Sequence, residues 1–211
     1  MANSCKLYGW AGSGSVAVQI ALEESGVPYE RIWVGKEPAQ LEAYRKINPT
    51  GKVPALMLPD GTVMAESAAM LIHLAAAHPD AQLAPQPGTS RHALFLQWML
   101  YLSANVYESV LRIYYSDRYL PAGAAAGAAD AIREKATADY LAQLEYIAGS
   151  LDPYVLGDAY SVADPYLYML ASWSPLDKAG LHARIPALGM HAARVGARAA
   201  VARVEADHAA P

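Results

Sequence analysis

The pattern of hydrophobic residues changes once along this chain, and that change limits the folds available to it. Up to residue 77, short β-type runs alternate with short helical ones, whereas residues 90–207 contain successive helical segments rich in alanine and tyrosine. Three prolines and a glycine in residues 78–90 mark a linker or a domain edge between the two parts. We therefore place a domain boundary near residue 84.

The first part predicts the element order β-α-β-α-β-β-α, which is a layered α/β arrangement. Tyr8 is expected to point from the first strand into the core, Gly26 to end the first helix, and Asp60-Gly61 to form a hairpin turn. Strands are expected at 6–8, 29–34, 53–58 and 62–65, and helices at 16–25, 38–47 and 67–77.

The second part predicts helices alone. One long helix should begin after a cap at Thr89 or Ser90 and continue to about Tyr119. A second is expected at 124–148, a third at 162–173, and shorter pieces up to 207. The late arginines and the acidic residues of the first helix are interpreted as solvated faces; they are Arg194, Arg198, Arg203, Glu23 and Glu24.

Composition excludes several classes of protein. Hydrophobic residues make up 54% and charged residues 17%, which argues against a disordered chain. The net charge of −4 argues against nucleic acid as the main partner. We expect no membrane association, because no apolar run reaches the roughly 18 residues of a span. One cysteine, Cys5, and a start without a secretory pattern favour a reducing, cytoplasmic location.

The segment from residue 48 to residue 74 carries the most information about function. Val53-Pro54 opens a strand, and proline has no N–H for a ladder, so it must occupy a strand start, an edge or a special turn. Glu66-Ser67 directly precedes a helix, where Ser67 could be a simple cap or part of a carboxylate site. Spacing alone favours the simple cap.

This segment nevertheless resembles the glutathione-binding half of the cytosolic glutathione transferases, and the chain is similar to bacterial members of beta-like, zeta-like or unassigned class. The similarity rests on N-P-x-G-x-V-P-A-L from residue 48, D-G at 60, E-S at 66, K-L-Y at 6 and the stretch 157–164. It implies an α/β thioredoxin-like N-terminal domain at 1–80, a linker at 81–89 and an all-α C-terminal helical domain at 90–211.

The resemblance also implies roles for individual residues. Pro54 would follow a cis peptide bond, and Val53 would pair through its main chain with the cysteinyl part of glutathione. Ser67 and the helix N-terminus would hold the γ-glutamyl carboxylate, and Glu66 its ammonium group. Lys52 would either reach the glycyl carboxylate or be a solvated lysine.

In this family one hydroxyl or thiol after the first strand lowers the pKa of the glutathione thiol. The position of the beta-class cysteine falls on Gly14, so that mechanism is in doubt. The active serine of the zeta class falls on Ser13 when counted from the strand and on Gly12 when counted from the helix. Ser13 is our first choice and Ser15 the second; each could instead be a helix cap or a turn serine.

The stretch 161–164 predicts a capping box in which Ser161 and Asp164 pair at the start of a helix. Pro165 would fall at the fourth helical position and remove the first backbone hydrogen bond, so a late start or a kink is expected. This motif is structural and carries no catalysis.

The function implied by the resemblance is that of a detoxifying glutathione transferase, with glutathione as co-substrate and no metal. The second substrate would be a small apolar electrophile bound between the serine loop and the aromatic residues of the long helix. The family also implies a homodimer. The alternatives are other glutathione-dependent chemistry, such as isomerisation, dehalogenation or peroxide reduction, and a non-catalytic binding protein.

Overall fold

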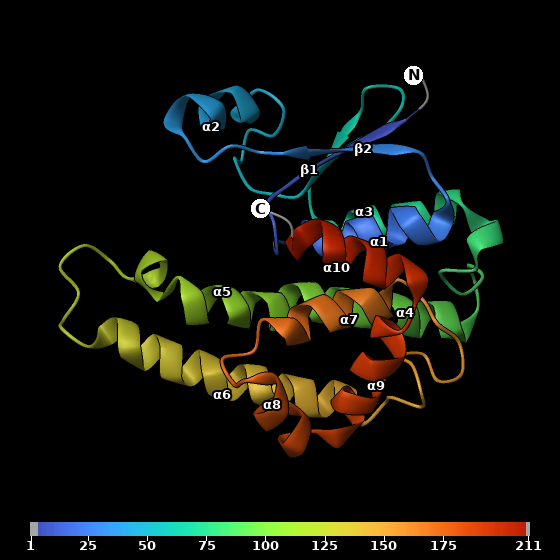
Figure 1. Cartoon of the computed structure of the whole chain (residues 1–211). Coiled ribbons are helices and arrows are strands. Elements are labelled where there is room, and N and C mark those ends of the chain that lie inside the picture. The colour runs from blue at the N-terminus through green and yellow to red at the C-terminus, as the bar shows by residue number, and fades with distance from the viewer. Residues whose placement is uncertain (1–3, 210–211) are drawn as a thin grey trace. The chain divides into compact units, whose positions relative to one another are not determined.

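The computed structural model describes residues 4–209, which divide into two compact units (Figure 1). The first unit combines the residues up to Pro85 with those from Gly196 onward, and the second comprises Gln86–Val195. The first unit contains a mixed sheet with helices, and the second contains helices. This arrangement confirms the predicted architecture of a thioredoxin-like domain and an all-α domain. In the described part of the chain, no helix is both long and apolar enough to cross a membrane.

The elements of the first unit are β1 (Cys5–Gly9), α1 (Ser15–Ser25), β2 (Tyr29–Trp33), α2 (Pro38–Arg45), β3 (Ala55–Met57), β4 (Val63–Met64), α3 (Ser67–Ala77), η1 (Pro79–Ala81) and α10 (Ala199–Ala209). The elements of the second are α4 (Ser90–Tyr101), the π-helical η2 (Leu102–Tyr107), α5 (Glu108–Tyr114), η3 (Ser116–Tyr119), α6 (Ala128–Ala148), α7 (Ala163–Ser172), α8 (Lys178–Arg184) and α9 (Pro186–Gly196). Every helix and strand predicted for the first 77 residues is present, with shifts at its ends.

The last helix groups with the first unit. α10 packs against α1, which itself packs against α3 (Figure 1). This grouping differs from the division made from the sequence, in which residues 90–211 formed one helical domain. Residues 1–3 and 210–211 of that division lie outside the described residues.

The sheet has four strands in the order β2-β1-β3-β4. β1 is parallel to β2 and antiparallel to β3, and β4 is antiparallel to β3. Successive side chains of a strand point to opposite faces. Leu7 is therefore buried on one face and Tyr8 on the other, where its ring lies 5.9 Å from that of Tyr44 in α2. The predicted inward position of Tyr8 is confirmed.

The predicted long helix is interrupted and shorter than expected. Thr89 is the residue that caps it, because its side chain accepts the N–H of His92 at 3.1 Å. The π-helical turn η2 follows α4, and the regular helix ends at Tyr114 instead of near Tyr119. Arg133 of α6 caps this end, since its Nε donates to the carbonyl of Ile113 in the last turn at 3.3 Å.

Two other helix starts correct the sequence prediction. α6 begins at Ala128 instead of residue 124, because Gly123 and Gly127 have φ of 78° and 84°, which right-handed helices exclude. α7 begins at Ala163, one residue after the predicted start at 162, so the expected late start is present and Pro165 falls in the first turn. The N–H that proline lacks has no partner within a helix at that place, so neither the lost bond nor the kink arises.

The predicted pairing of Ser161 with Asp164 is present and belongs to a larger buried network. Asp164 Oδ2 accepts the N–H of Ser161 at 2.8 Å, and its Oδ1 accepts the N–H of Val155 at 2.9 Å. The ring of His191 also lies against Oδ1, at 3.0 Å. The carboxylate is fully buried, so these partners replace the water it has lost.

The prediction that the late arginines and Glu23 and Glu24 form solvated faces holds for Arg194 and Arg203, which are exposed, but was wrong for Arg198, Glu23 and Glu24, which are partly buried. Arg198 makes a two-pronged ion pair with Glu24, at 2.6 and 2.9 Å, and Arg203 pairs with Glu23 at 3.0 Å. The Glu24 side chain is only 13% exposed. These pairs fasten α10 and the residue directly before it to α1, across 180 and 174 positions of sequence.

We expect Asp164→Ala to lower the free energy of unfolding by about 3–5 kcal/mol, because it leaves buried donors without an acceptor. Urea denaturation measures the change. Asp139→Ala is the matched control: this exposed carboxylate pairs with Lys135 on the surface of α6, and its loss should cost about 1 kcal/mol or less. Equal losses in the two variants would contradict a central role for Asp164.

Candidate functional site

Three segments that carry predicted site residues meet at one end of the sheet. β1 ends at Gly9 and leads into the loop with Ser13. Because β3 is antiparallel to β1, its first residue, Ala55, pairs with Tyr8 near that end, directly after Val53-Pro54. β4 runs back beside β3 and ends at Met64, just before Glu66 and Ser67. The topology therefore brings together segments that the sequence places up to 54 positions apart, as in Ser13 and Ser67.

The serine loop is held by its own hydrogen bonds. Ser13 Oγ accepts the backbone N–H of Trp10 at 3.2 Å and that of Ser15 at 3.3 Å. The two serine hydroxyl oxygens lie 3.0 Å apart, and Ser15 Oγ donates to the Trp10 carbonyl at 3.4 Å. Ser13 is partly exposed, whereas Ser15 is 1% exposed as the first residue of α1.

Gly9 is required for the close packing of this loop. A Cβ atom at Gly9 would lie 2.3 Å from Ser15 Oγ and 2.5 Å from Ser15 Cβ. Those distances are far below van der Waals contact, so Ser15 occupies the space that any larger residue at position 9 would need. The absence of a side chain on Gly9 is what allows α1 to start so close to the end of β1.

The segment before β3 is fixed from the side of α2. The Val53–Pro54 peptide bond is cis, and Pro54 is buried. The carbonyl of Lys52 accepts the Tyr44 hydroxyl at 2.8 Å and the Asn48 side-chain amide at 2.7 Å. The Lys52 side chain is exposed, and Val53 lies just before the first ladder pair of β3. The backbone of this segment is therefore anchored, while the ammonium group of Lys52 is exposed.

Glu66 has an unusual backbone. Its φ of 69° and ψ of 105° lie in a region that non-glycine residues rarely occupy, at a typical cost of about 1–3 kcal/mol. It directly precedes α3, whose first residue, Ser67, is 7% exposed. Glu66 itself is exposed. The positive φ thus occurs at an exposed acidic residue directly before the first turn of α3.

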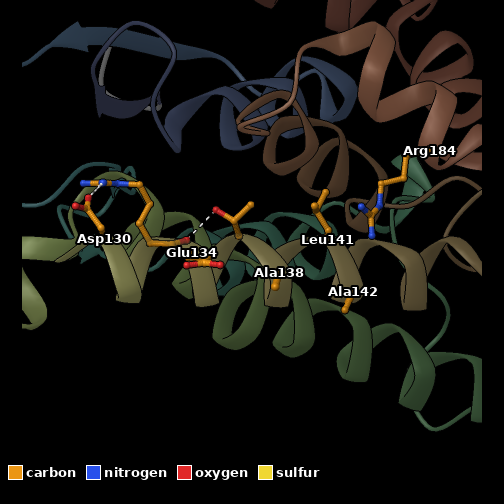
Figure 2. A pocket seen from close by; sticks show the side chains of 8 residues that line it. Asp130, Glu134, Ala138, Leu141, Ala142 and Arg184 are labelled. Carbon is orange, nitrogen blue, oxygen red and sulfur yellow. Dashed lines mark hydrogen bonds and ion pairs between the residues drawn. The ribbon is translucent and has the colours of Figure 1, made fainter. Parts of the chain in front are cut away.

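Two hollows elsewhere on the described surface are lined by no predicted site residue. One, of about 600 Å³, lies along α6 in the second unit, where Asp130 and Arg133 pair at one end and Arg184 lies at the other (Figure 2). The other lies at the opposite end of the sheet, beside Cys5. Burial raises the pKa of the Cys5 thiol, which favours a packing role.

The aromatic residues of the predicted long helix pack against one another and against other helices of the second unit. Trp98 and Tyr101 contact each other edge to face and both contact Tyr146 of α6. Tyr107 contacts Trp173 edge to face. An electrophile site that uses these residues stays a prediction. Within residues 4–209, no three His, Cys, Asp or Glu side chains are arranged as metal ligands.

Comparison with known proteins agrees with this architecture. A family model described as the glutathione S-transferase N-terminal domain matches residues 15–77. Glutathione S-transferase GstA of Escherichia coli is 29% identical over 175 residues, covering 80% of this chain and 82% of that protein. The uncharacterized GST-like protein YncG of Escherichia coli is 30% identical over 176 residues, covering 81% of this chain and 82% of that protein.

A solved structure has the same fold over almost the whole chain. The crystal structure of a glutathione transferase homologue from Sulfitobacter, with bound glutathione, has a TM-score of 0.85 and 30% identity and covers 97% of this chain and 98% of that one. A thioredoxin-like unit joined to a helical unit thus defines the class of protein. The chain belongs to the glutathione transferase superfamily, as its sequence motifs predicted.

Three residues of the site region were missed by sequence reasoning. Gly9 directly follows the strand predicted at 6–8. A glycine at such a place is a recognised sign of close backbone approach, so its role could have been predicted. Gln19 and His208 contact each other at 2.9 Å, and His208 accepts the N–H of Gly12. No local pattern signals these contacts, because they join α1 and its preceding loop to a helix at the other end of the chain.

We expect Gly9→Ala to lower the free energy of unfolding by about 1–3 kcal/mol, because Ser15 and the start of α1 must move. Thermal and urea unfolding measure the loss. Gly149→Ala is the matched control: its φ is −64°, its nearest added contact is 3.4 Å, and it should change stability by about 0.5 kcal/mol or less. A Gly9→Ala variant as stable as this control would refute the packing argument.

Proposed function

We propose that this protein is a glutathione transferase that binds glutathione at the meeting point of the three segments and activates its thiol through Ser13. The observation that carries the proposal is the hydrogen bonding of Ser13. Its oxygen already accepts two backbone N–H groups and its hydroxyl lies 3.0 Å from Ser15 Oγ, so Ser13 acts as a donor, and its proton would turn from Ser15 to the sulfur of bound glutathione. Ser15 is buried and its hydroxyl faces the Trp10 carbonyl, which favours a structural role.

One such donor can supply most of the free energy needed to lower the pKa of the glutathione thiol. A free thiol has a pKa of about 8.5, and lowering it by two units requires about 2.7 kcal/mol of preferential binding of the thiolate. A hydrogen bond to a charged group contributes about 1.5–3 kcal/mol. The N-terminus of α1, which begins directly after the serine loop, adds about 0.3–1 kcal/mol.

The other contacts proposed for glutathione follow the family resemblance. Val53, before Pro54, would pair with the cysteinyl backbone. Ser67 and the first turn of α3 would hold the γ-glutamyl carboxylate, and Glu66 the ammonium group. The exposed side chain of Lys52 would reach the glycyl carboxylate. Bound glutathione in the Sulfitobacter relative supports glutathione as the ligand.

The proposed reaction is a nucleophilic substitution. The thiol proton leaves to solvent, the thiolate forms a bond to an electrophilic carbon of an apolar substrate, and the leaving group departs with its electron pair. The protein contributes position and thiolate stabilisation. We further propose a cytoplasmic, homodimeric enzyme of detoxification, on the resemblance alone.

We expect Ser13→Ala to raise the pKa of bound glutathione by about 1–2 units, the equivalent of one charge-assisted hydrogen bond. An ultraviolet titration of the thiolate band against pH measures this, with the wild-type thiol titrating near pH 6.5. Ser15→Ala is the matched variant, and it should lower thermal stability while moving the thiol pKa by less than about 0.5 unit.

Other results of this titration would redirect the proposal. A thiolate lost only in Ser15→Ala would move the donor role to Ser15. Saturable binding without thiolate formation in the wild type would favour a binding protein over an enzyme. If glutathione does not bind at all, the site assignment itself is wrong.

We expect Glu66→Gly to separate binding from stability. Glycine adopts the positive φ freely, so the variant should be as stable as the wild type or up to about 1 kcal/mol more stable. Its affinity for glutathione should fall about tenfold or more, because the ammonium loses its carboxylate partner. Calorimetric titration and thermal unfolding measure the two effects. Glu66→Ala retains the strain, so a stability as high as that of Glu66→Gly would contradict this explanation.

A further inference from the structure

α10 brings a histidine from the far end of the chain to the loop that carries Ser13. His208 lies near the end of α10, and its Nδ1 atom is 2.9 Å from the backbone nitrogen of Gly12. The two residues are 196 positions apart in sequence, yet they belong to the same compact unit. This hydrogen bond joins the last helix to the residue directly before Ser13.

Hydrogen bonds on both sides of the ring define its tautomer. Nδ1 accepts the Gly12 N–H, so Nε2 carries the proton and donates to Gln19 Oε1 at 2.9 Å. The amide nitrogen of Gln19 donates in turn to Asp207 at 2.7 Å and to the Tyr29 hydroxyl at 2.9 Å. Each donor meets an acceptor only with the ring in this neutral form.

The surroundings of the ring keep it neutral and in place. Burial and the positive charge of Arg31 on β2 lower the pKa of His208 to about 4, against the opposing charge of Asp207. Trp33 contacts the ring edge to face, with the centroids 5.0 Å apart. At neutral pH, Nδ1 therefore keeps the lone pair that accepts the Gly12 N–H.

Packing does not hold the loop at Gly12. Gly12 is exposed, with a φ of 67°, and a Cβ atom built there would contact nothing within 4 Å. A glycine with open space around it has wide backbone freedom. The Ser13 N–H donates to the Trp10 carbonyl at 3.1 Å and closes this turn, so the direction of the Ala11–Gly12 peptide within it depends on polar contacts such as that from His208.

We propose that His208 is a positioning residue for thiol activation, which fixes the Ala11–Gly12 peptide in the turn that leads into Ser13 and so aims the Ser13 hydroxyl at the glutathione sulfur. The inference rests on the function proposed above, because Ser13 is the donor there. His208 acts through Gly12 and leaves the proton transfer to Ser13 and the thiol.

Three variants test this role. His208→Ala removes the acceptor, and His208→Asn keeps one, since the asparagine oxygen occupies roughly the place of Nδ1. Arg203→Ala is the matched control on the same helix, because it removes the pairing with Glu23 and leaves the loop contact intact. Thermal unfolding and glutathione binding first confirm that each variant is folded.

We expect His208→Ala to raise the pKa of the bound thiol and to lower kcat by about threefold to tenfold, the effect of one neutral hydrogen bond. The KM for glutathione should change by less than about twofold, because the binding groups on β3 and α3 are untouched. His208→Asn should recover most of kcat, and Arg203→Ala should match the wild type. The assay uses glutathione with an activated aryl halide.

Solvent exchange of the Gly12 amide hydrogen, followed by nuclear magnetic resonance, tests the tether without any substrate. We expect protection in the wild type, exchange about tenfold faster or more in His208→Ala, and recovery in His208→Asn. Acidification through the pKa of His208 should also release the amide; Arg31 on β2 and Asp207 on α10 are the charged groups that face the ring.

The outcomes separate the two proposals. An unchanged Gly12 amide in His208→Ala would overturn the tether. A released amide with an unchanged thiol pKa and kcat, or an equal loss of activity in Arg203→Ala, would overturn the positioning role. A wild-type protein that forms no thiolate would overturn the proposed function, whereas the amide exchange would still decide whether His208 holds the loop.

Discussion

The pairing of β1 with strands on both sides organises the first unit. β1 runs parallel to β2 and antiparallel to β3, so the end of β1, the start of β3 and the end of β4 lie together. A serine loop, an anchored prolyl turn and a helix N-terminus are thereby presented at one end of one sheet. The candidate site needs no long insertion or mobile lid; it follows from strand direction and from the short connections between strands and helices.

Local signals account for the parts of this structure that could be predicted. Gly26 ends α1 with a φ of 65°, and Thr89 caps α4 with its own side chain. Each signal acts within a few residues, so the sequence around it is sufficient to find it. The same holds for the run from Asn48 to Pro54, where Asn48 and Thr50 hydrogen-bond their own turn. The effect of Pro165 depends on its position: α7 starts late, as expected, and this leaves the proline in the first turn, where it costs no backbone hydrogen bond.

Contacts between distant positions account for the rest. Arg198 and Glu24 were each read as solvated, because a charged residue on a predicted helix carries no sign of its partner. The sequence around His208 and Gln19 likewise gives no sign that they contact each other. The strained φ of Glu66 is imposed by the turn into α3. The family motifs could locate the segments of the site, but which serine faces outward depended on hydrogen bonds that only the three-dimensional arrangement reveals.

The union of α10 with the first unit has a consequence for how the protein is made. During synthesis, β1 through α3 emerge early, and α10 is translated only after the entire helical unit. Until then Glu24 lacks Arg198, and the loop before α1 lacks His208. The thioredoxin-like unit is therefore completed after the helical unit although it is begun before it, and docking of α10 links the maturation of the serine loop to the prior translation of the helical unit.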